Sequence, residues 1–257
     1  MNSFESYYRE NGGYTEYLAG QNSQFFAKYV DSLLDCGLAG PAVLDVGSGA
    51  GQVLEALQGK GACAVGVEVS RPSVERVREM GFRCELVRGV QLPFADESFD
   101  AVGAFNVLEH VEQAEALVRE MARVLTVGGV LVLSSPNFLR CIGWRDYHPR
   151  MRGLRNKLIN ASALWRKWSH TRHDSSGVRM DRMAPLDREP FSADDDAIVV
   201  TNLLELKVLV EQIGCSVVRA ECTDRYFSPV LEKIANATPL KYAMGNAFVV
   251  SRKGRLE

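Results

Sequence analysis

Residues 43–52 read VLDVGSGAGQ, an apolar run with one acid that passes into three glycines within five positions. The run before the glycines is typical of a buried strand, and the stretch after them, QVLEALQGKG (52–61), is typical of an amphipathic helix. Glycine adopts positive φ and has no Cβ, so a ligand can approach the backbone of such a turn closely. The segment therefore predicts a strand, a ligand-binding turn and a helix in an α/β fold.

The same alternation continues along the chain. Apolar runs at 63–69, 84–87, 98–108 and 128–137 predict strands, and amphipathic segments at 71–81 and 113–125 predict helices between them. A helix at 201–214 and strands at 215–222 and 247–253 follow. Strands separated by helices of this length indicate right-handed crossovers. We predict an α/β fold with a doubly wound, mostly parallel seven-stranded sheet and helices on both faces.

The alternation stops between about residues 138 and 196, which indicates an insertion after the fifth strand. We predict four parts: an N-terminal helical lid (1–39), a cofactor-binding core (40–137), a basic insertion or cap on the acceptor side (138–196), and the C-terminal part of the core sheet (197–257). Three acids close the insertion, Asp194, Asp195 and Asp196. We interpret them as a solvated helix N-terminus, with a metal-binding or acceptor-binding role as the less favoured alternative.

The glycine spacing and two acids limit the chemical classes of ligand that the turn can bind. The spacing is G-x-G-x-G, whereas the dinucleotide fingerprint is G-x-G-x-x-G. Asp45 precedes the first glycine, where a carboxylate would repel a phosphate but suit a cation. Glu68 ends the next long strand, a position from which a carboxylate can hold a ribose diol. A ribose-bearing, positively charged ligand without a phosphate fits these observations.

Five stretches carry a resemblance: VLDVGSGAGQ, GVEVS, LPFADESFDAV, NVLEHV and RVLTVGGVLVLSSPN. Together they look like the class I S-adenosylmethionine-dependent methyltransferases of the methyltransferase type 11 group, over roughly residues 40–137. The resemblance implies S-adenosylmethionine as cofactor and S-adenosylhomocysteine as product. It implies cofactor contacts from Asp45, Gly47, Ser48, Gly49, Gly51, Glu68, Val69 and Asn106.

One stretch departs from the family. Members often have an acid shortly before LPF, near the adenine amino group, and this chain reads VRGVQLPF with Arg88 or Gly89 at that point. We predict that the backbone of Gly89 and Val90 replaces the missing adenine contact.

Two histidines are candidates for general acid or base chemistry. His110, beside Glu109, follows the fourth strand and so faces the predicted substrate side, although the pair could instead fix the loop and cap the next helix. His148 lies in the stretch GWRDYHPR, with Asp146 as a candidate to orient it. His170 and His173 have metal-like spacing, but their basic neighbours disfavour a cation, and we predict no metal site.

The insertion is strongly basic. Residues 140–182 hold 11 Lys and Arg against 3 Asp, a net charge of +8 in a chain whose total is −2. Aromatic residues are interleaved with these bases, which predicts a cap for an anionic acceptor, although a solvated basic surface is an alternative. The acceptor-side candidates are Tyr14, Trp144, Arg145 and Tyr147. Tyr14 belongs to an N-terminal group of tyrosines that either covers the cofactor or simply packs.

We therefore predict an enzyme that transfers a methyl group in line to a small-molecule or carrier-linked, anionic acceptor, most simply to a hydroxyl oxygen. The alternatives are an RNA methyltransferase, a nicotinamide-dependent oxidoreductase and a non-catalytic cofactor-binding protein. Nucleic acid is the less favoured partner because no separate RNA-binding module is visible. No run of about 18 apolar residues and no secretory signal is recognisable, so we expect a cytoplasmic protein without a membrane span. The sequence does not predict the oligomeric state.

Overall fold

The computed structural model describes residues 20, 26–143, 146–171, 178–186, 194–224 and 227–255. The elements of the first half are α3 (Ala27–Leu34), β1 (Ala42–Val46), α4 (Gln52–Gly59), β2 (Cys63–Glu68), α5 (Arg71–Glu79), β3 (Arg83–Leu86), β4 (Phe99–Phe105), η2 (Leu108–His110) and α6 (Ala114–Val124). The second half contains β5 (Leu125–Ser135), η3 (Pro149–Met151), α7 (Gly153–Thr171), α8 (Leu203–Gln212), β6 (Cys215–Thr223), α9 (Pro229–Asn236), η4 (Pro239–Tyr242) and β7 (Asn246–Lys253).

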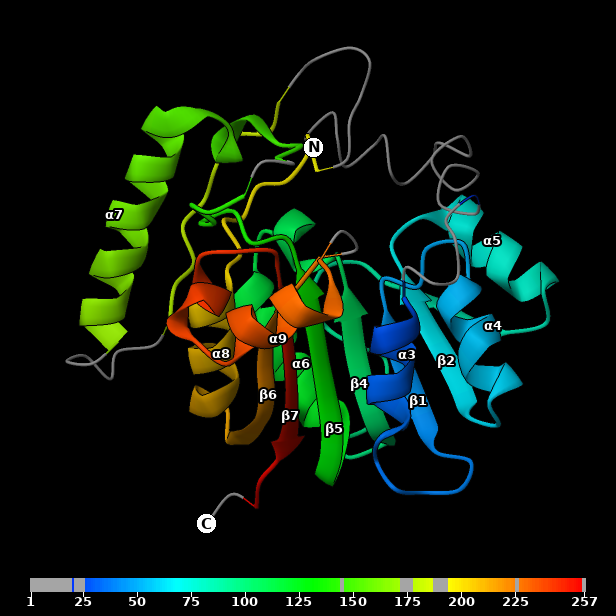
Figure 1. Cartoon of the computed structure of the whole chain (residues 1–257). Coiled ribbons are helices and arrows are strands. Elements are labelled where there is room, and N and C mark those ends of the chain that lie inside the picture. Colours follow the sequence, from blue (N-terminus) through cyan, green and yellow to red (C-terminus); the bar gives the residue numbers. More distant parts are fainter. Residues whose placement is uncertain are drawn as a thin grey trace. The chain divides into compact units, whose positions relative to one another are not determined.

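The strands form one seven-stranded sheet in the order β3-β2-β1-β4-β5-β7-β6 (Figure 1). β1 pairs in parallel with both β2 and β4, and β2 pairs in parallel with β3. The predicted fold class is confirmed. The strand order reverses between β1 and β4, so the turn after β1 lies at the switch point where ligands bind in doubly wound sheets.

The chain divides into two compact units, of which the first comprises residues 1–105, 116–132 and 252–257. Within this unit α3 packs against β4, and α4 packs against β1 and β2 and touches α3 (Figure 1). Ser70 caps the start of α5 because its side chain accepts a hydrogen bond from the N–H of Ser73, and Pro72 occupies the first turn of the helix. Both are residues that favour a helix start, which is why the sequence located this helix well.

The second unit comprises residues 106–115 and 133–251. Within it α8 and α9 pack against β6, and α7 lies outside α8 (Figure 1). Part of the predicted insertion has a small core of its own, because Phe138, Met151 and Ala163 are buried together with Val200. The sequence did not predict α7 or α9, and the four predicted parts of the chain stay a prediction.

Asp194, Asp195 and Asp196 do not form the predicted helix N-terminus. They lie in a turn, and the next helix, α8, begins at Leu203. Asp195 and Asp196 are buried, so the interpretation as a solvated acidic run is wrong. Their surroundings are described with the candidate site. No helix among the described residues is long and apolar enough to span a membrane.

Candidate active site

The turn after β1 contains three glycines with positive φ: Gly47 at 76°, Gly49 at 52° and Gly51 at 90°. The N–H groups of Gly47 and Ser48 donate to the carbonyl of Val67 in β2, which fixes the turn against the neighbouring strand. Residues that carry a side chain rarely adopt positive φ, so the turn favours glycine at these positions.

Gly51 also provides close packing. A Cβ at this position would lie 3.0 Å from Cγ2 of Val77 and 3.4 Å from Sδ of Met80, at the end of α5. Gly51 is the residue that precedes α4, and its missing side chain lets α4 start close to α5. Helix packing is thus one reason for glycine at position 51, and the predicted cofactor contacts of Gly47, Gly49 and Gly51 stay predictions.

Glu68 joins the turns that follow β1 and β2. Its Oε2 accepts a hydrogen bond of 2.9 Å from the N–H of Gly49. Its Oε1 accepts from the N–H groups of Val69 at 2.7 Å and Ser70 at 3.0 Å. The predicted ribose-binding carboxylate is thus held in one orientation at the switch point, next to the glycine turn.

Asp45 is buried in the first unit, one residue before the end of β1. Its Oδ1 accepts a hydrogen bond of 2.7 Å from the hydroxyl of Tyr29 in α3. Burial raises the pKa of Asp45 to about 7 although the Tyr29 hydrogen bond acts to lower it, and the charge of Glu68 raises it further. Its neighbours across the sheet are Gly66 and Gly103, which leave room for Ser48 and Tyr29. A cationic ligand beside Asp45 would favour the ionised carboxyl.

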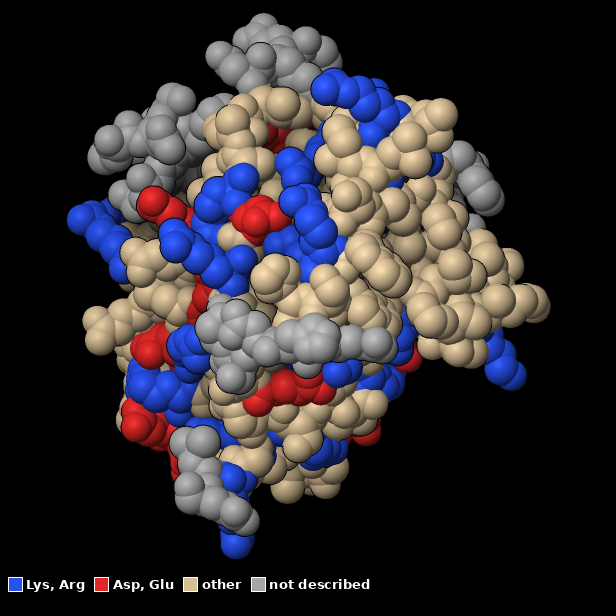
Figure 2. Space-filling model, turned by 90° about the vertical axis from the view of Figure 1, so that its left-hand side faces the viewer, with Lys and Arg blue, Asp and Glu red and all other residues tan. Residues whose placement is uncertain are grey.

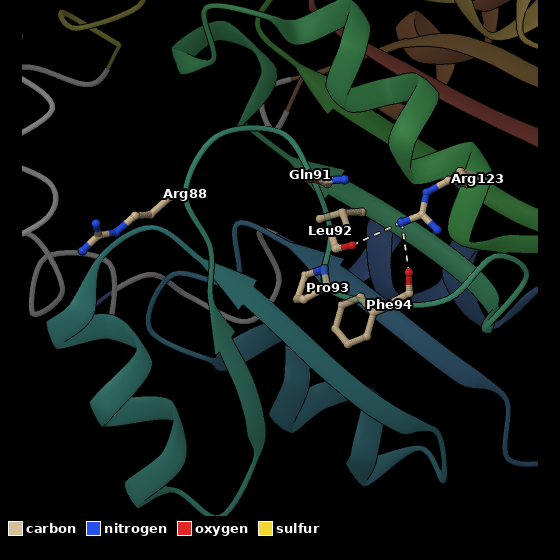
Figure 3. A pocket seen from close by; sticks show the side chains of 6 residues that line it. All are labelled: Arg88, Gln91, Leu92, Pro93, Phe94 and Arg123. Carbon is tan, nitrogen blue, oxygen red and sulfur yellow. Dashed lines mark hydrogen bonds between the residues drawn. The ribbon is translucent and has the colours of Figure 1, made fainter.

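The loop from residue 87 to 94, where the family's adenine contact is expected, borders an open depression of about 620 Å³ (Figure 3). Arg123 organises this loop by donating to the carbonyls of Leu92 and Phe94 and by pairing with Glu120. Arg88 points away from the other lining residues in Figure 3. Gly89 has positive φ, and a Cβ there would meet open space. The predicted backbone contact of Gly89 and Val90 with adenine stays a prediction.

In the second unit, Asn106 and the Glu109–His110 pair follow the end of β4. Asn106 has φ of 54°, an uncommon value for a residue other than glycine, and its N–H donates to the carbonyl of Ser134. Strained backbone of this kind is frequent at functional sites. The predicted cofactor contact of Asn106 stays a prediction.

Glu109 and His110 belong to a buried cluster of acids. His110 Nδ1 lies 2.6 Å from Asp196 Oδ2, and its Nε2 lies 3.8 Å from Glu109 Oε1 and 3.7 Å from Asp194 Oδ1. Glu109 is fully buried, and its other oxygen accepts from the hydroxyl of Ser135 at 2.6 Å. The backbone carbonyl of Glu109 accepts from the N–H groups of Ile198 and Val199, which ties η2 to the segment that follows the three acids.

These neighbours control protonation of the imidazole. Burial acts to lower the pKa of His110, but the hydrogen bond that its imidazole donates to Asp196 and the charges of the three acids raise it to about 9. Burial raises the pKa of Glu109 to about 7. A protonated imidazole cannot accept a proton, so without a further cation His110 is better suited to holding the acids together than to acting as a base.

Tyr147 lies beside the same cluster, and His148 follows it in the sequence. The Tyr147 hydroxyl hydrogen-bonds to Asp194, and the guanidinium of Arg140 stands 5.7 Å from the Tyr147 ring centre. His148 is buried against Phe138, and its Nδ1 accepts from the N–H of Arg150 at 3.2 Å. Asp146, the predicted orienting acid, pairs with Arg140 and Lys157. The catalytic role of His148 stays a prediction, and Tyr14, Trp144 and Arg145 lie outside the described residues.

Many of the basic side chains of the insertion form ion pairs with acidic residues of the same chain. Arg140 and Lys157 pair with Asp146, Lys167 pairs with Glu205 and Asp181, and Arg182 pairs with Glu115. Arg150 differs, because its pKa is lowered by burial and its buried Nε has no hydrogen-bond partner among the described residues. Sequence reasoning did not single out Arg150, and only its burial distinguishes it from the other bases.

α7 combines exposed apolar and basic residues. Leu154, Leu158 and Trp165 are 76%, 63% and 76% exposed. Arg155 and Arg166 are also exposed, and neither forms an ion pair with another described residue. Figure 2, which views the side where α7 lies in Figure 1, shows Lys and Arg side chains gathered beside an uncharged area. The 19 residues of α7 include no acid.

Residues 44–133 match the sequence model of the family described as "Methyltransferase domain". This chain carries a class I S-adenosylmethionine-dependent methyltransferase domain. The predicted family is thereby confirmed, and the cofactor that belongs to this domain is S-adenosylmethionine.

Two curated relatives are similar to parts of this methyltransferase domain. Methyltransferase GfsG of Streptomyces halstedii is 40% identical over 105 residues, which cover 37% of this chain and 38% of the relative. The ubiquinone biosynthesis O-methyltransferase of Xanthomonas oryzae is 37% identical over 116 residues, covering 42% of this chain and 48% of the relative. The matches thus span less than half of either relative.

A solved structure supports the fold over more of the chain. The 1,6-didemethyltoxoflavin-N1-methyltransferase of Burkholderia thailandensis, solved with bound 1,6-didemethyltoxoflavin and S-adenosylhomocysteine, superposes with a TM-score of 0.57. The identity is 13%, and the match covers 98% of this chain and 86% of that one. At this identity the likeness concerns the fold alone.

Proposed function

We propose that this protein transfers the methyl group of S-adenosylmethionine to a hydroxyl oxygen of an anionic acceptor that is carried on a lipid. The cofactor part rests on the methyltransferase domain, and the acceptor part rests on the chemistry of the second unit. None of the relatives and solved structures described above is a nicotinamide-dependent enzyme.

The observation that carries the proposal is the arrangement of Glu68 at the switch point. Its carboxylate is fixed by N–H groups from two turns, one of which is the glycine turn. A carboxylate at the end of the second strand suits the two hydroxyls of a ribose, and the neighbouring buried Asp45 favours a positive charge over a phosphate. An adenosine with a cationic amino-acid chain meets both requirements.

Arg150 supports an anionic acceptor. An Arg whose Nε is buried without a partner carries a desolvation cost that an anion would relieve. Arg150 lies two residues after His148, so an anion bound there would lie near the predicted base His148 and the predicted acceptor-side residue Tyr147. A phosphate or carboxylate can accept the paired hydrogen bonds that a guanidinium offers.

The exposed face of α7 supports a lipid-borne acceptor. At about 100° per residue, Leu154, Leu158 and Trp165 fall on one stripe, and Arg155 and Arg166 fall on the stripe beside it. Exposed leucine and tryptophan flanked by bases are typical of helices that lie in the interface of an anionic membrane. We therefore assign this face to an anionic lipid surface.

The transfer itself needs orientation and removal of one proton. The acceptor oxygen attacks the methyl carbon as the carbon–sulfur bond breaks, which yields a methyl ether and S-adenosylhomocysteine. The hydroxyl proton leaves to a base. Of the two predicted candidates His148 is preferred, because the acids around His110 favour its protonated form. These roles are tested by replacing each histidine with asparagine and measuring turnover against pH. If the histidine is the base, the rise in turnover with pH on the acidic side of the wild-type profile should disappear in the variant.

Cofactor binding is tested by calorimetric titration with S-adenosylhomocysteine, with NADH as the comparison ligand. Glu68→Ala should weaken binding at least tenfold, while Glu55→Ala, which changes an exposed glutamate of α4, should leave it unchanged. Thermal melts show whether Glu68→Ala remains folded. Equal affinities for all three proteins, or a preference for NADH, would contradict the proposal.

Lipid binding is tested by co-sedimentation with vesicles of phosphatidylglycerol and of phosphatidylcholine. The wild type should sediment with the anionic vesicles, less so at high salt, and the double variant Leu158→Ser, Trp165→Ser should remain in solution. Val230→Ser changes an apolar residue of α9 that is 68% exposed and serves as control. Sedimentation of the double variant at the wild-type level would refute a role for α7.

A further inference from the structure

The buried cluster around His110 has a geometry that the proposed function does not use. Glu109 Oε1, His110 Nε2 and one carboxylate oxygen of Asp194 all lie within 4.8 Å of one another. The three residues come from η2 and from the turn at 194–196, so the second unit alone brings them together. One imidazole and two carboxylates are a donor set for a divalent cation.

Three further contacts orient these donors. His110 Nδ1 faces Asp196 Oδ2 at 2.6 Å, which turns Nε2 toward Glu109 and Asp194. A carboxylate on the far nitrogen of a metal-binding histidine is the usual outer contact that fixes the ring. Hydrogen bonds from two hydroxyl groups orient the carboxylates: Ser135 donates to Glu109, and Tyr147 donates to Asp194.

Among the described residues, none donates a hydrogen bond to Oε1 of Glu109. Glu109 is fully buried, and this is the oxygen turned toward His110. A buried carboxylate oxygen without a donor is unfavourable, and a cation would satisfy it. The distances of 3.7 and 3.8 Å from Nε2 are too long for hydrogen bonds. Around a cation with bonds of about 2.1 Å, neighbouring ligand atoms lie roughly 3.0–3.5 Å apart, so a small contraction would complete the site.

We propose that Glu109, His110 and Asp194 bind one divalent cation, with Asp196 as the outer partner of the imidazole. The sequence favoured no metal, because the ligands lie 84 positions apart and the acids resemble a solvated run. Three protein ligands leave coordination positions for oxygen atoms. An acceptor with two neighbouring hydroxyls could fill them, a further step that rests on the proposed function.

The site is tested with Mn²⁺ on protein that has been stripped of metal with a chelator. Loss of the free-ion electron paramagnetic resonance signal should report one tightly bound ion per chain, and pulsed spectra should show coupling to one imidazole nitrogen. Glu109→Gln and Asp194→Asn should each weaken Mn²⁺ binding at least tenfold, and Asp196→Asn should weaken it roughly 10- to 100-fold. Glu112→Gln, an exposed glutamate of the same segment, is the matched control.

Two further measurements make the result decisive. Competition with a chromophoric chelator repeats the titration with Zn²⁺, and absence of stoichiometric binding for both ions would overturn the proposal. Equal binding by wild type and the ligand variants, or bound Mn²⁺ without nitrogen coupling, would also overturn it. Thermal melts and S-adenosylhomocysteine titrations show that the variants are folded, and they separate failure of the metal site from failure of the proposed methyl transfer.

Discussion

Replacing Asp45 by asparagine should change how stability depends on pH in the cofactor-free protein. The wild-type carboxyl is buried beneath the Tyr29 hydroxyl and has a pKa of about 7, raised from 3.8. Because the folded state disfavours the ionised form, this carboxyl stabilises the fold least at high pH. Its contribution is complete below pH 3.8 and is lost as the pH rises through 7. Asparagine keeps an acceptor for Tyr29 and cannot ionise.

The size of the effect follows from linkage. A group with these two pKa values makes unfolding easier at pH 8 than at pH 5 by about 3 kcal/mol. For a chain of this size, that corresponds to roughly 5–10 °C in melting temperature. The melting temperature of Asp45→Asn minus that of the wild type should therefore grow by this amount between pH 5 and pH 8.

The assay is thermal unfolding followed by circular dichroism on protein freed of cofactor. Asp31→Asn is the control, because Asp31 lies in α3 near Tyr29, pairs with Lys60 and is exposed. Its difference from the wild type should not change with pH. A constant difference for Asp45→Asn, whatever its sign, would show that the carboxyl does not occupy the buried site beside Tyr29.

Three further changes have defined outcomes. Gly103→Ala places a Cβ 2.8 Å from the Tyr29 ring, so it should lower the free energy of unfolding by about 1–3 kcal/mol in urea denaturation, and Tyr29→Ala in the same chain should recover part of that loss. Arg123→Ala removes the donor that holds the loop at Leu92 and should cost about 1–3 kcal/mol in the same assay, with faster hydrogen exchange in that loop. Arg150→Ala should raise the KM for an anionic acceptor with little change in affinity for S-adenosylhomocysteine, measured by steady-state kinetics and calorimetry.

The core of the fold was predictable because its strands and helices carry regular local patterns. The apolar run at 43–46, the glycine turn and the proline-started helix at 71–79 each match one kind of element. The resemblance to methyltransferases depends on the same stretch. These features are local in sequence, so they could be recognised without knowledge of the contacts.

α7 was missed because its exposed side is not polar. Leu154, Leu158 and Trp165 face outward while Ala163 is buried, so apolar residues occur on both sides and no single stripe marks the helix. Helices are recognised from sequence by a single apolar stripe that faces the core, and a helix with apolar residues on its outer face as well does not show this pattern.

The cluster around His110 was missed for a different reason. Acids in a row are normally solvated, and nothing near Asp194 in the sequence indicates that it meets a histidine from another part of the chain. Similarly, Arg150 looks like any other base of the insertion until its burial is known. Charged residues that owe their role to distant partners cannot be identified from local patterns.

The position of β7 has a consequence for synthesis of the chain. β7 lies between β5 and β6 in the sheet, although both of those strands precede it in the sequence. As the polypeptide leaves the ribosome, β6 cannot join the sheet until β7 has followed it, and β5 presents an unpaired edge during that interval. Exposed strand edges promote aggregation, so this interval is when the nascent protein has most need of a chaperone.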